Sequence, residues 1–369
     1  MKHTPNPIEK SADRPSEMAR VQTAALVIIA FAVVLFLLVQ ARFILISLAS
    51  AIIVFSLTSD VINFIARLRV GPFRIPNWLA SLAAVLLIAT ALLTLTSIVV
   101  AQVNTVLITM LAYAERAPDA IAALFAWAGD DVEAAVRNSV SSIEVSAYLR
   151  GAAGGATSLT QATVLVILFV GFLFAERVWF QTKLLNFTGD PVQARRVGRI
   201  IASIIRRVNY YLLVKTIISL ATGVMTYALA RAFGLEIAVP LGIMTFVLNF
   251  IPNIGSIIAT GLVVLAAYIQ LGDPWMTALI FVIAGTIQFV NGSIIDPMLM
   301  GRALRLSSFG ILLSLAFWGA VWGVPGMFLS VPIMVMLLVV CSHVAALRPF
   351  AILLSREGLP EAETTLENP

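Results

Sequence analysis

The sequence predicts an all-α polytopic membrane protein with about eight membrane segments, including two Pro/Gly-broken or re-entrant hairpin runs in the C-terminal half. Hydrophobic residues make up 60% of the 369-residue chain and charged residues only 12%, whereas ordinary soluble domains carry about 25% charged residues. The mean hydropathy is +1.00. The apolar segments are continuous rather than alternating, which excludes a transmembrane β-barrel.

The first hundred residues hold three predicted spans behind a polar N-terminus. Residues 1–20 include three prolines, and we expect a flexible cytoplasmic segment there. The first apolar run, 21–41, is longer than the apolar region of a signal peptide and lacks a small-residue cleavage site, so we interpret it as a span. Two further spans are expected at 43–62 and 78–103. Residues 21–103 therefore form spans one to three.

Charge in the loops predicts the orientation, because cytoplasmic loops carry an excess of Lys and Arg. Residues 1–20 and 179–207 are basic, whereas 104–156 carries three arginines and six acids. We therefore expect 104–156 to be an external amphipathic helical segment and 179–207 a basic cytoplasmic loop, with span four at 157–178 between them. The N-terminus and the acidic tail, 348–369, are then cytoplasmic.

Part of the basic loop has the pattern of an interfacial helix. At 100° per residue, five arginines within residues 195–208 fall on one arc, and isoleucines and valines occupy the opposite arc. Such a helix places its apolar face in the bilayer and its basic face against anionic lipid headgroups. We expect it to lead from the loop into span five, at 208–231.

The C-terminal core, 208–347, contains two apolar runs that are too long and too interrupted for single helices. The run 237–271 has no charged residue yet contains "NFIPNIG" from residue 249, and the run 306–342 contains "WGVPGMF" from residue 322. Proline and glycine interrupt helices, and in a membrane unwound backbone is tolerated only where protein or water covers it. Each run is either a re-entrant hairpin or a pair of short spans, and a further span is expected at 275–295.

Three stretches of this core resemble the signature blocks of the AI-2E family of prokaryotic transporters, also called the autoinducer-2 exporter family. They are "LNFIPNIGSIIA" (248–259), "QFVNGSIIDPMLMGRALRLSSF" (288–309) and "LLSLAFWGAVWGVPGMFLSVPIMV" (312–335). The resemblance covers the order of spans and is most specific from about 208 to 345. The sequence departs from the family pattern near Asn291, where an acid is usual, and at Ser308, where proline is frequent.

The resemblance implies a secondary transporter or exporter in the prokaryotic inner or plasma membrane, assembled as a homo-oligomer. Some members of the family are associated with export of signalling molecules and others with cation/proton antiport. The substrate therefore does not carry over from the family to this chain. We expect a small solute or an ion.

Paired interrupted segments point to a transport site near the middle of the membrane. The predicted substrate path consists of uncharged residues at the two breaks and on the span between them. Gln288 and Asn291 are three residues apart and share a helical face, so they either line an aqueous path or bond a neighbouring helix. The path residues are Asn249, Pro252, Asn253, Gly255, Gln288, Asn291, Gly323, Pro325 and Gly326.

Two ionisable residues are candidates for ion or proton coupling, because charged groups inside membranes are costly and mark function. Asp296 follows an uncharged span and precedes Pro297. It either takes up a proton or cation, or lies at a helix end in water. Lys215 lies about two turns into span five. It either reaches the cytoplasmic interface or supplies a buried counter-charge for an anionic solute.

Several absences narrow the function. The sequence has no G-x-x-x-x-G-K-[ST], H-E-x-x-H or G-x-S-x-G motif, so we expect no ATPase, metalloprotease or serine hydrolase, and no enzyme. One cysteine and two distant histidines predict no metal site, and we expect no cofactor. The net charge of +5 lies in loops and indicates orientation rather than nucleic-acid binding. Transport would be gradient-driven, and the alternative is a non-transporting membrane scaffold or assembly factor.

Overall fold

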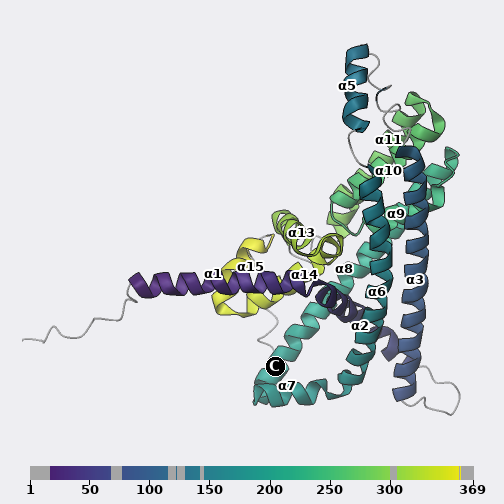
Figure 1. Cartoon of the computed structure of the whole chain (residues 1–369). Helices are drawn as coiled ribbons and strands as arrows, with labels where there is room; N and C mark the ends of the chain where they lie inside the picture. Colours follow the sequence, from purple (N-terminus) through teal and green to yellow (C-terminus); the bar gives the residue numbers. More distant parts are fainter. Residues whose placement is uncertain are drawn as a thin grey trace, which may run out of the picture.

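A computed structural model describes residues 17–67, 77–114, 122, 129–141, 145–299, 306–356 and 358. Within these residues every regular element is a helix, and β pairing is limited to one bridge between Leu306 and Ser355 (Figure 1). The first half contains α1 (Glu17–Gln40), α2 (Arg42–Arg67), α3 (Asn77–Ala114), α5 (Asp130–Ser141), α6 (Val145–Glu176), η2 (Arg177–Trp179), α7 (Phe180–Thr188) and α8 (Pro191–Ala232). The second half contains α9 (Ala238–Leu248), α10 (Ile254–Leu271), α11 (Pro274–Phe289), the π-helix η3 (Val290–Ile295), α13 (Ser308–Trp322), α14 (Val324–His343), η4 (Ala345–Leu347) and α15 (Arg348–Leu354).

The helix lengths confirm the predicted class. Seven helices of the described chain are long and apolar enough to cross a membrane, and shorter apolar helices accompany them. The chain is therefore an all-α polytopic membrane protein. The predicted span 275–295 is only in part an α-helix, because it changes at Val290 into the π-helical turn η3.

Each interrupted run forms a helical hairpin with a short first arm. In the run 237–271, α9 has 11 residues and α10 has 18. In the run 306–342, α13 has 15 residues and α14 has 20. At 1.5 Å per residue the first arms reach only about 17 and 23 Å, short of a hydrocarbon core of about 30 Å. The second arms are long enough to cross most or all of it.

The long helix α8 connects the parts of the molecule. It begins where Asp190 caps the backbone N–H of Val192 at 2.8 Å and Pro191 takes the first turn, and it continues for 42 residues. The predicted basic loop, 179–207, is helical in the structure except at Gly189 and Asp190, which separate α7 from α8. Its amphipathic part and the predicted span five belong to one uninterrupted helix.

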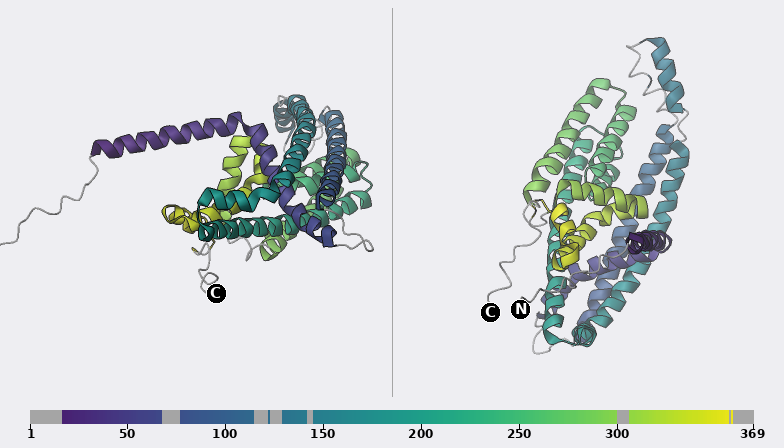
Figure 2. Two further views of the ribbon diagram at one scale, coloured as in Figure 1. Left: turned by 90° about the horizontal axis from the view of Figure 1, so that it is seen from below. Right: turned by 90° about the vertical axis from the view of Figure 1, so that its left-hand side faces the viewer.

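The N-terminal helices form a second group. Buried residues of α2, α3 and α6 pack into one apolar cluster, and α3 and α6 run side by side over most of their length (Figure 1). A hydrogen bond of 2.6 Å from Ser56 Oγ of α2 to Asn209 Oδ1 of α8 ties this group to the core. Helix α1 projects from the body (Figure 2), and no residue in its apolar span is buried.

The predicted external segment, 104–156, is described in part. Helix α3 continues into it as far as Ala114, and α5 begins at Asp130, directly after Gly129 with its positive φ of 107°. The dipeptide Pro118–Asp119 in this segment suits a helix start in sequence, because Pro fits the first turn and the acid suits the positive end of the helix dipole, and it lies outside the described residues. The first turn of α5 carries three acids, which stabilise the positive end of the helix dipole.

Glycines allow close backbone contacts between helices of the core. A Cβ atom on Gly223 of α8 would lie 2.8 Å from the carbonyl oxygen of Gly242 in α9, so the two backbones touch there. A Cβ atom on Gly255, at the start of α10, would lie 1.8 Å from the carbonyl oxygen of Leu248. The tip of the α9–α10 hairpin therefore has no room for any side chain at residue 255.

This packing predicts that an added methyl group destabilises the protein at residue 255 of α10 but not at residue 261. Gly255→Ala should lower the thermal stability of the purified protein, by about 1–3 kcal/mol, because the backbone of α9 must move to accommodate the Cβ atom. Gly261→Ala is the matched control on the same helix, since a Cβ atom there meets nothing within 4 Å. Thermal unfolding in detergent measures both, and equal stability of the two variants would show that the tip is not close-packed.

Candidate functional site

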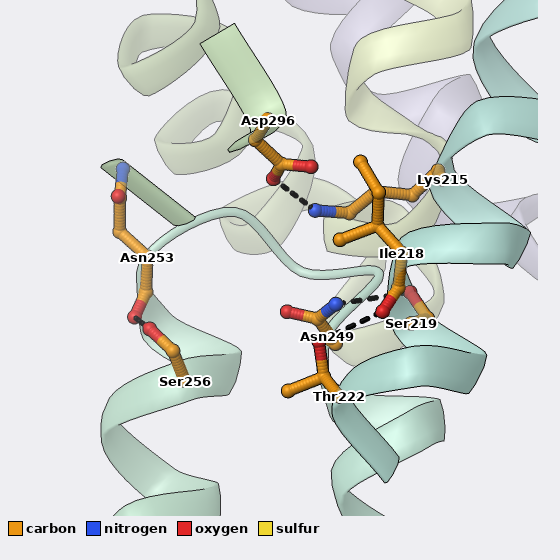
Figure 3. Close-up of polar contacts among 8 residues, drawn as sticks. All are labelled: Lys215, Ile218, Ser219, Thr222, Asn249, Asn253, Ser256 and Asp296. Atoms are coloured by element: carbon orange, nitrogen blue, oxygen red, sulfur yellow. Dashed lines mark hydrogen bonds and ion pairs between the residues drawn. The ribbon is translucent and has the colours of Figure 1, made fainter. Parts of the chain in front are cut away.

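A buried ion pair joins α8 to the end of the π-helix. Lys215 Nζ lies 2.6 Å from Asp296 Oδ2. Figure 3 shows the two groups facing each other. The Lys215 side chain is 4% exposed and that of Asp296 is 20% exposed, so the carboxylate is the more accessible partner. The two coupling candidates of the sequence are therefore a single ion pair. The Lys215 ammonium group is buried against Asp296, and the Asp296 carboxylate is paired with it rather than free in water.

Lys215 begins a buried polar stripe on α8. Ser219, Thr222 and Thr226 follow it at intervals of four, three and four residues, which places all four side chains on one face, and all four are buried. Thr222 donates to the carbonyl of Ile218. Ser219 Oγ accepts a hydrogen bond of 3.1 Å from Asn249 Nδ2 at the end of α9 (Figure 3). The stripe thus links the ion pair to the first break.

The first break is a tight turn that bonds its own backbone. The N–H groups of Asn249, Phe250 and Ile251 donate to carbonyls of α9, and those of Ile254 and Gly255 donate to carbonyls inside the turn. A hydrocarbon environment requires this, because unsatisfied peptide groups there cost several kcal/mol. The turn therefore satisfies these five N–H groups within the protein.

Asn253 is the strained residue of this turn. Its φ of 61° and ψ of −51°, with a hydrogen bond of 2.7 Å from Ile254 N–H to the carbonyl of Pro252, define a γ-turn of the rare, strained type. Positive φ is tolerated by asparagine better than by most residues. Asn253 is exposed and lies on the opposite side of the turn from Asn249 (Figure 3), so the structure does not bring the two amides together.

The second break is a one-residue joint. Gly323, with φ 68° and ψ −146°, occupies a region open essentially to glycine alone. Pro325 lies in the first turn of α14, where its missing N–H costs nothing. A Cβ atom on Gly326 would lie 2.0 Å from the carbonyl oxygen of Trp318, so α13 and α14 touch there.

The two breaks approach each other through aromatic rings. Phe250 of the first break and Phe328 of the second are stacked, with centroids 6.0 Å apart and an interplanar angle of 17°. A substrate path that includes both breaks requires them to lie near each other. The contact is made by two side chains that are not among the predicted path residues.

Buried polar atoms without a hydrogen bond lie on elements that pack against α8. Among the described residues there are four such side-chain atoms, on Thr245, Gln288, Asn291 and Asp296. All four belong to α9, α11, η3 or the residue that ends η3, and α9, α11 and η3 contact α8. Native proteins satisfy nearly all buried polar groups, with ordered water or a ligand where protein groups are absent. The arrangement can hold water, a proton or a polar solute.

Three features of this site were not predicted from the sequence. The pairing of Lys215 with Asp296, 81 residues apart, has no local signal. The role of the Ser219 hydroxyl does have a local signal in the sequence. Four polar residues, Lys215, Ser219, Thr222 and Thr226, follow the helical period within a hydrophobic helix. The π-helical turn has a weaker signal in Pro297, which lacks an N–H donor and crowds the carbonyl four residues earlier.

Comparison with known proteins gives consistent matches. A model of the family described as AI-2E family transporter matches residues 25–346. The AI-2 transport protein TqsA of Escherichia coli K12 is 35% identical over 193 residues, which are 52% of this chain and 54% of the relative. A candidate transport protein of Borreliella burgdorferi is 31% identical over 225 residues, 60% of this chain and 62% of the relative. One from Haemophilus influenzae is 38% identical over 170 residues, 46% and 48% of the two chains.

The matched part of the chain thus spans about half to three fifths of the length of these relatives.

The ion pair predicts an asymmetry between single and double substitutions. Asp296→Asn should destabilise the protein by about 3–5 kcal/mol, because it leaves a buried ammonium group without its counter-charge. Combining it with Lys215→Met should recover most of that loss. Glu133→Gln is the control, because the pair of Glu133 with Arg137 is exposed on α5 and should contribute less than about 1 kcal/mol. A double variant no more stable than Asp296→Asn in thermal unfolding would contradict the buried-charge explanation.

Proposed function

The chain belongs to the AI-2E family of transporters, and on this premise we propose that it is a secondary transporter, which moves a small solute or ion across a prokaryotic inner or plasma membrane along a gradient. The observation that carries the proposal is the buried Lys215–Asp296 pair, 2.6 Å apart between α8 and an interrupted segment. Ionisable groups inside membranes are rare and mark functional sites, among them ion and substrate pathways. The sequence has no G-x-x-x-x-G-K-[ST] motif that would bind ATP as an energy source.

The pair suits the coupling of ion binding to a conformational change, because neutralising one charge leaves the other charge without a partner. While Lys215 and Asp296 meet, the site is neutral. A proton or cation that binds the carboxylate, or an anion that binds the ammonium group, leaves the other charge uncompensated in a poorly solvated place, at a cost of several kcal/mol. Binding therefore favours a rearrangement of α8 against η3. A carrier driven by a gradient needs this link between ion binding and conformation.

The proposed path extends from the pair along the neighbouring polar side chains. Gln288 and Asn291 each leave one polar atom without a partner, and Asn249 is held against Ser219 by its amide. We assign solute contact to these three amides. The tips, with Pro252, Asn253 and Gly255 in one hairpin and Gly323, Pro325 and Gly326 in the other, shape the turns that border the path.

The proposal extends to the orientation of the protein, its lipid contacts and its assembly. We propose a cytoplasmic N-terminus and an external 104–156 segment, from the arginine asymmetry. The exposed arginines at the start of α8, Arg195, Arg196 and Arg199, would contact anionic lipid headgroups. A homo-oligomer is proposed from the family resemblance.

Flux measurements on purified protein in proteoliposomes test the function. The probes are AI-2, because the E. coli relative is named for its transport, and Na⁺ or K⁺ added against a pH gradient reported by trapped pyranine. The parent should exceed protein-free vesicles with at least one probe. Asp296→Asn should reduce that flux by about tenfold or more, because the carboxylate that would bind a proton or cation is gone.

Two controls separate transport from stability. The double variant Lys215→Met with Asp296→Asn should be stable yet inactive. Thr286→Ala removes an exposed hydroxyl that bonds only its own helix, at Val282, and should transport like the parent. Parent flux equal to that of empty vesicles with every probe would favour the scaffold alternative.

Cysteine labelling tests the orientation. In a Cys341→Ser background, a membrane-impermeant maleimide should label Asp130→Cys in intact cells, and Gln193→Cys only after permeabilisation, because both positions are exposed and the arginine-rich side faces the cytoplasm. Labelling of Gln193→Cys from outside would reverse the proposed topology.

A further inference from the structure

The register of Asp296 depends on the π-helical turn. In an α-helix each residue advances the direction of the side chain by about 100°, so Asp296 would point about 140° away from Asn291, five residues earlier. In the structure the backbone N–H of Asp296 donates to the carbonyl of Asn291. This i→i+5 bond closes one π-helical turn and brings both residues to one side of the helix. Gln288, three residues before Asn291, lies on that side too.

We propose that the turn Val290–Ile295 is a positioning device, which sets the Asp296 carboxylate against Lys215 and in line with the amides of Gln288 and Asn291. Its significance for transport rests on the proposed function, but its geometry does not. A π-helical turn amounts to an α-helix with one extra residue. Here the extra residue converts two separate polar faces into a single site.

The side chains on that face support a shared site. Gln288 Oε1, Asn291 Nδ2 and Asp296 Oδ1 are all buried without a hydrogen-bond partner, and they provide two acceptors and one donor. Buried orphan atoms on three successive turns of one face are what a common ligand, or a row of waters, would satisfy. In plain α-helical register, Asp296 would turn away from the two amides and from Lys215.

The residues on the opposite side of the turn can be removed to test the register. Gly292 and Ser293 are exposed, and a Cβ atom on Gly292 would meet nothing within 4 Å. Removing either residue therefore deletes no packing contact of the core. The remaining turn closes with an ordinary i→i+4 bond between Asp296 and Asn291, and Asp296 keeps its direction. Inserting a residue has no such solution and moves Ile295 into the place of Asp296.

Cross-linking reads the register without depending on transport. Lys215→Cys is combined in turn with Ile295→Cys, Asp296→Cys and Pro297→Cys in the full-length Cys341→Ser protein, and a short bifunctional methanethiosulfonate is applied. In the parent background, cross-linking at 296 should exceed that at 295 and 297 by about tenfold, given the angle between successive residues. Deletion of Ser293 should leave the maximum at 296. Insertion of Ala after Gly292 should move it to 295.

The deletion is the decisive arm, because an ordinary α-helix would move its maximum to 297. A maximum at 297 after deletion, or at 295 in the parent, overturns the inference. Gly292→Ala is the matched control and should leave the pattern unchanged. If deletion of Ser293 prevents folding, judged by gel filtration, deletion of Gly292 replaces it. Failure of both deletions to fold, while the insertion folds, also overturns the inference, since a π-helical turn has a residue to spare.

In flux assays the deletion variant should resemble the parent and the insertion variant should resemble Asp296→Asn. A correct cross-linking pattern without any parent flux would refute the proposed function and leave the positioning role intact. A failed cross-linking pattern with normal parent flux would refute the positioning role and leave the proposed function intact.

Discussion

Backbone hydrogen bonding in an apolar environment is the constraint on which the core depends. Two hairpins interrupt their helices inside apolar runs, and each interruption must leave few peptide groups unpaired. The α9–α10 turn meets this requirement with a strained γ-turn at Asn253 and with Gly255 pressed against the carbonyl of Leu248. The α13–α14 joint meets it with a single glycine, Gly323, and a proline placed where no donor is needed. Because the backbone is satisfied locally, the polar side chains nearby are left available for other contacts.

Those side chains concentrate along α8. Its buried stripe starts at Lys215, and the ion pair with Asp296 and the hydrogen bond to Asn249 attach two different interrupted segments to the same helix face. The backbone contact of Gly223 with Gly242 fixes α9 against α8. The ion pair can break at the cost of one exchangeable charge interaction, whereas the glycine contact cannot slide without steric overlap. Rearrangement around the site should therefore move η3 relative to a joined α8–α9 unit.

The sequence was sufficient for the fold class and for the position of both hairpins, because hydropathy and Pro/Gly punctuation report them directly. It also identified Lys215 and Asp296 as candidates, since an ionisable group inside an apolar run is conspicuous. Their pairing was not predictable, because it depends on how α8 packs against a segment 81 residues later. The direction of Asp296 was not predictable from a period of 3.6, because the chain leaves that period at Val290. The arc of arginines opposite isoleucines and valines predicted a helix within 195–208, but it did not predict that this helix and span five are one uninterrupted helix of 42 residues.

The stacked rings of Phe250 and Phe328 set a scale for motion between the hairpins. The pairs α9–α10 and α13–α14 share few other contacts in the described chain, and an aromatic pair contributes about 0.5–1.5 kcal/mol beyond its buried area. A difference of 1.4 kcal/mol is a tenfold change in an equilibrium. The ring geometry alone therefore shifts the balance between joined and separated tips by about two- to tenfold, in addition to the effect of the apolar area that the rings bury. A ligand that binds better to the separated form shifts this balance by its difference in affinity for the two forms.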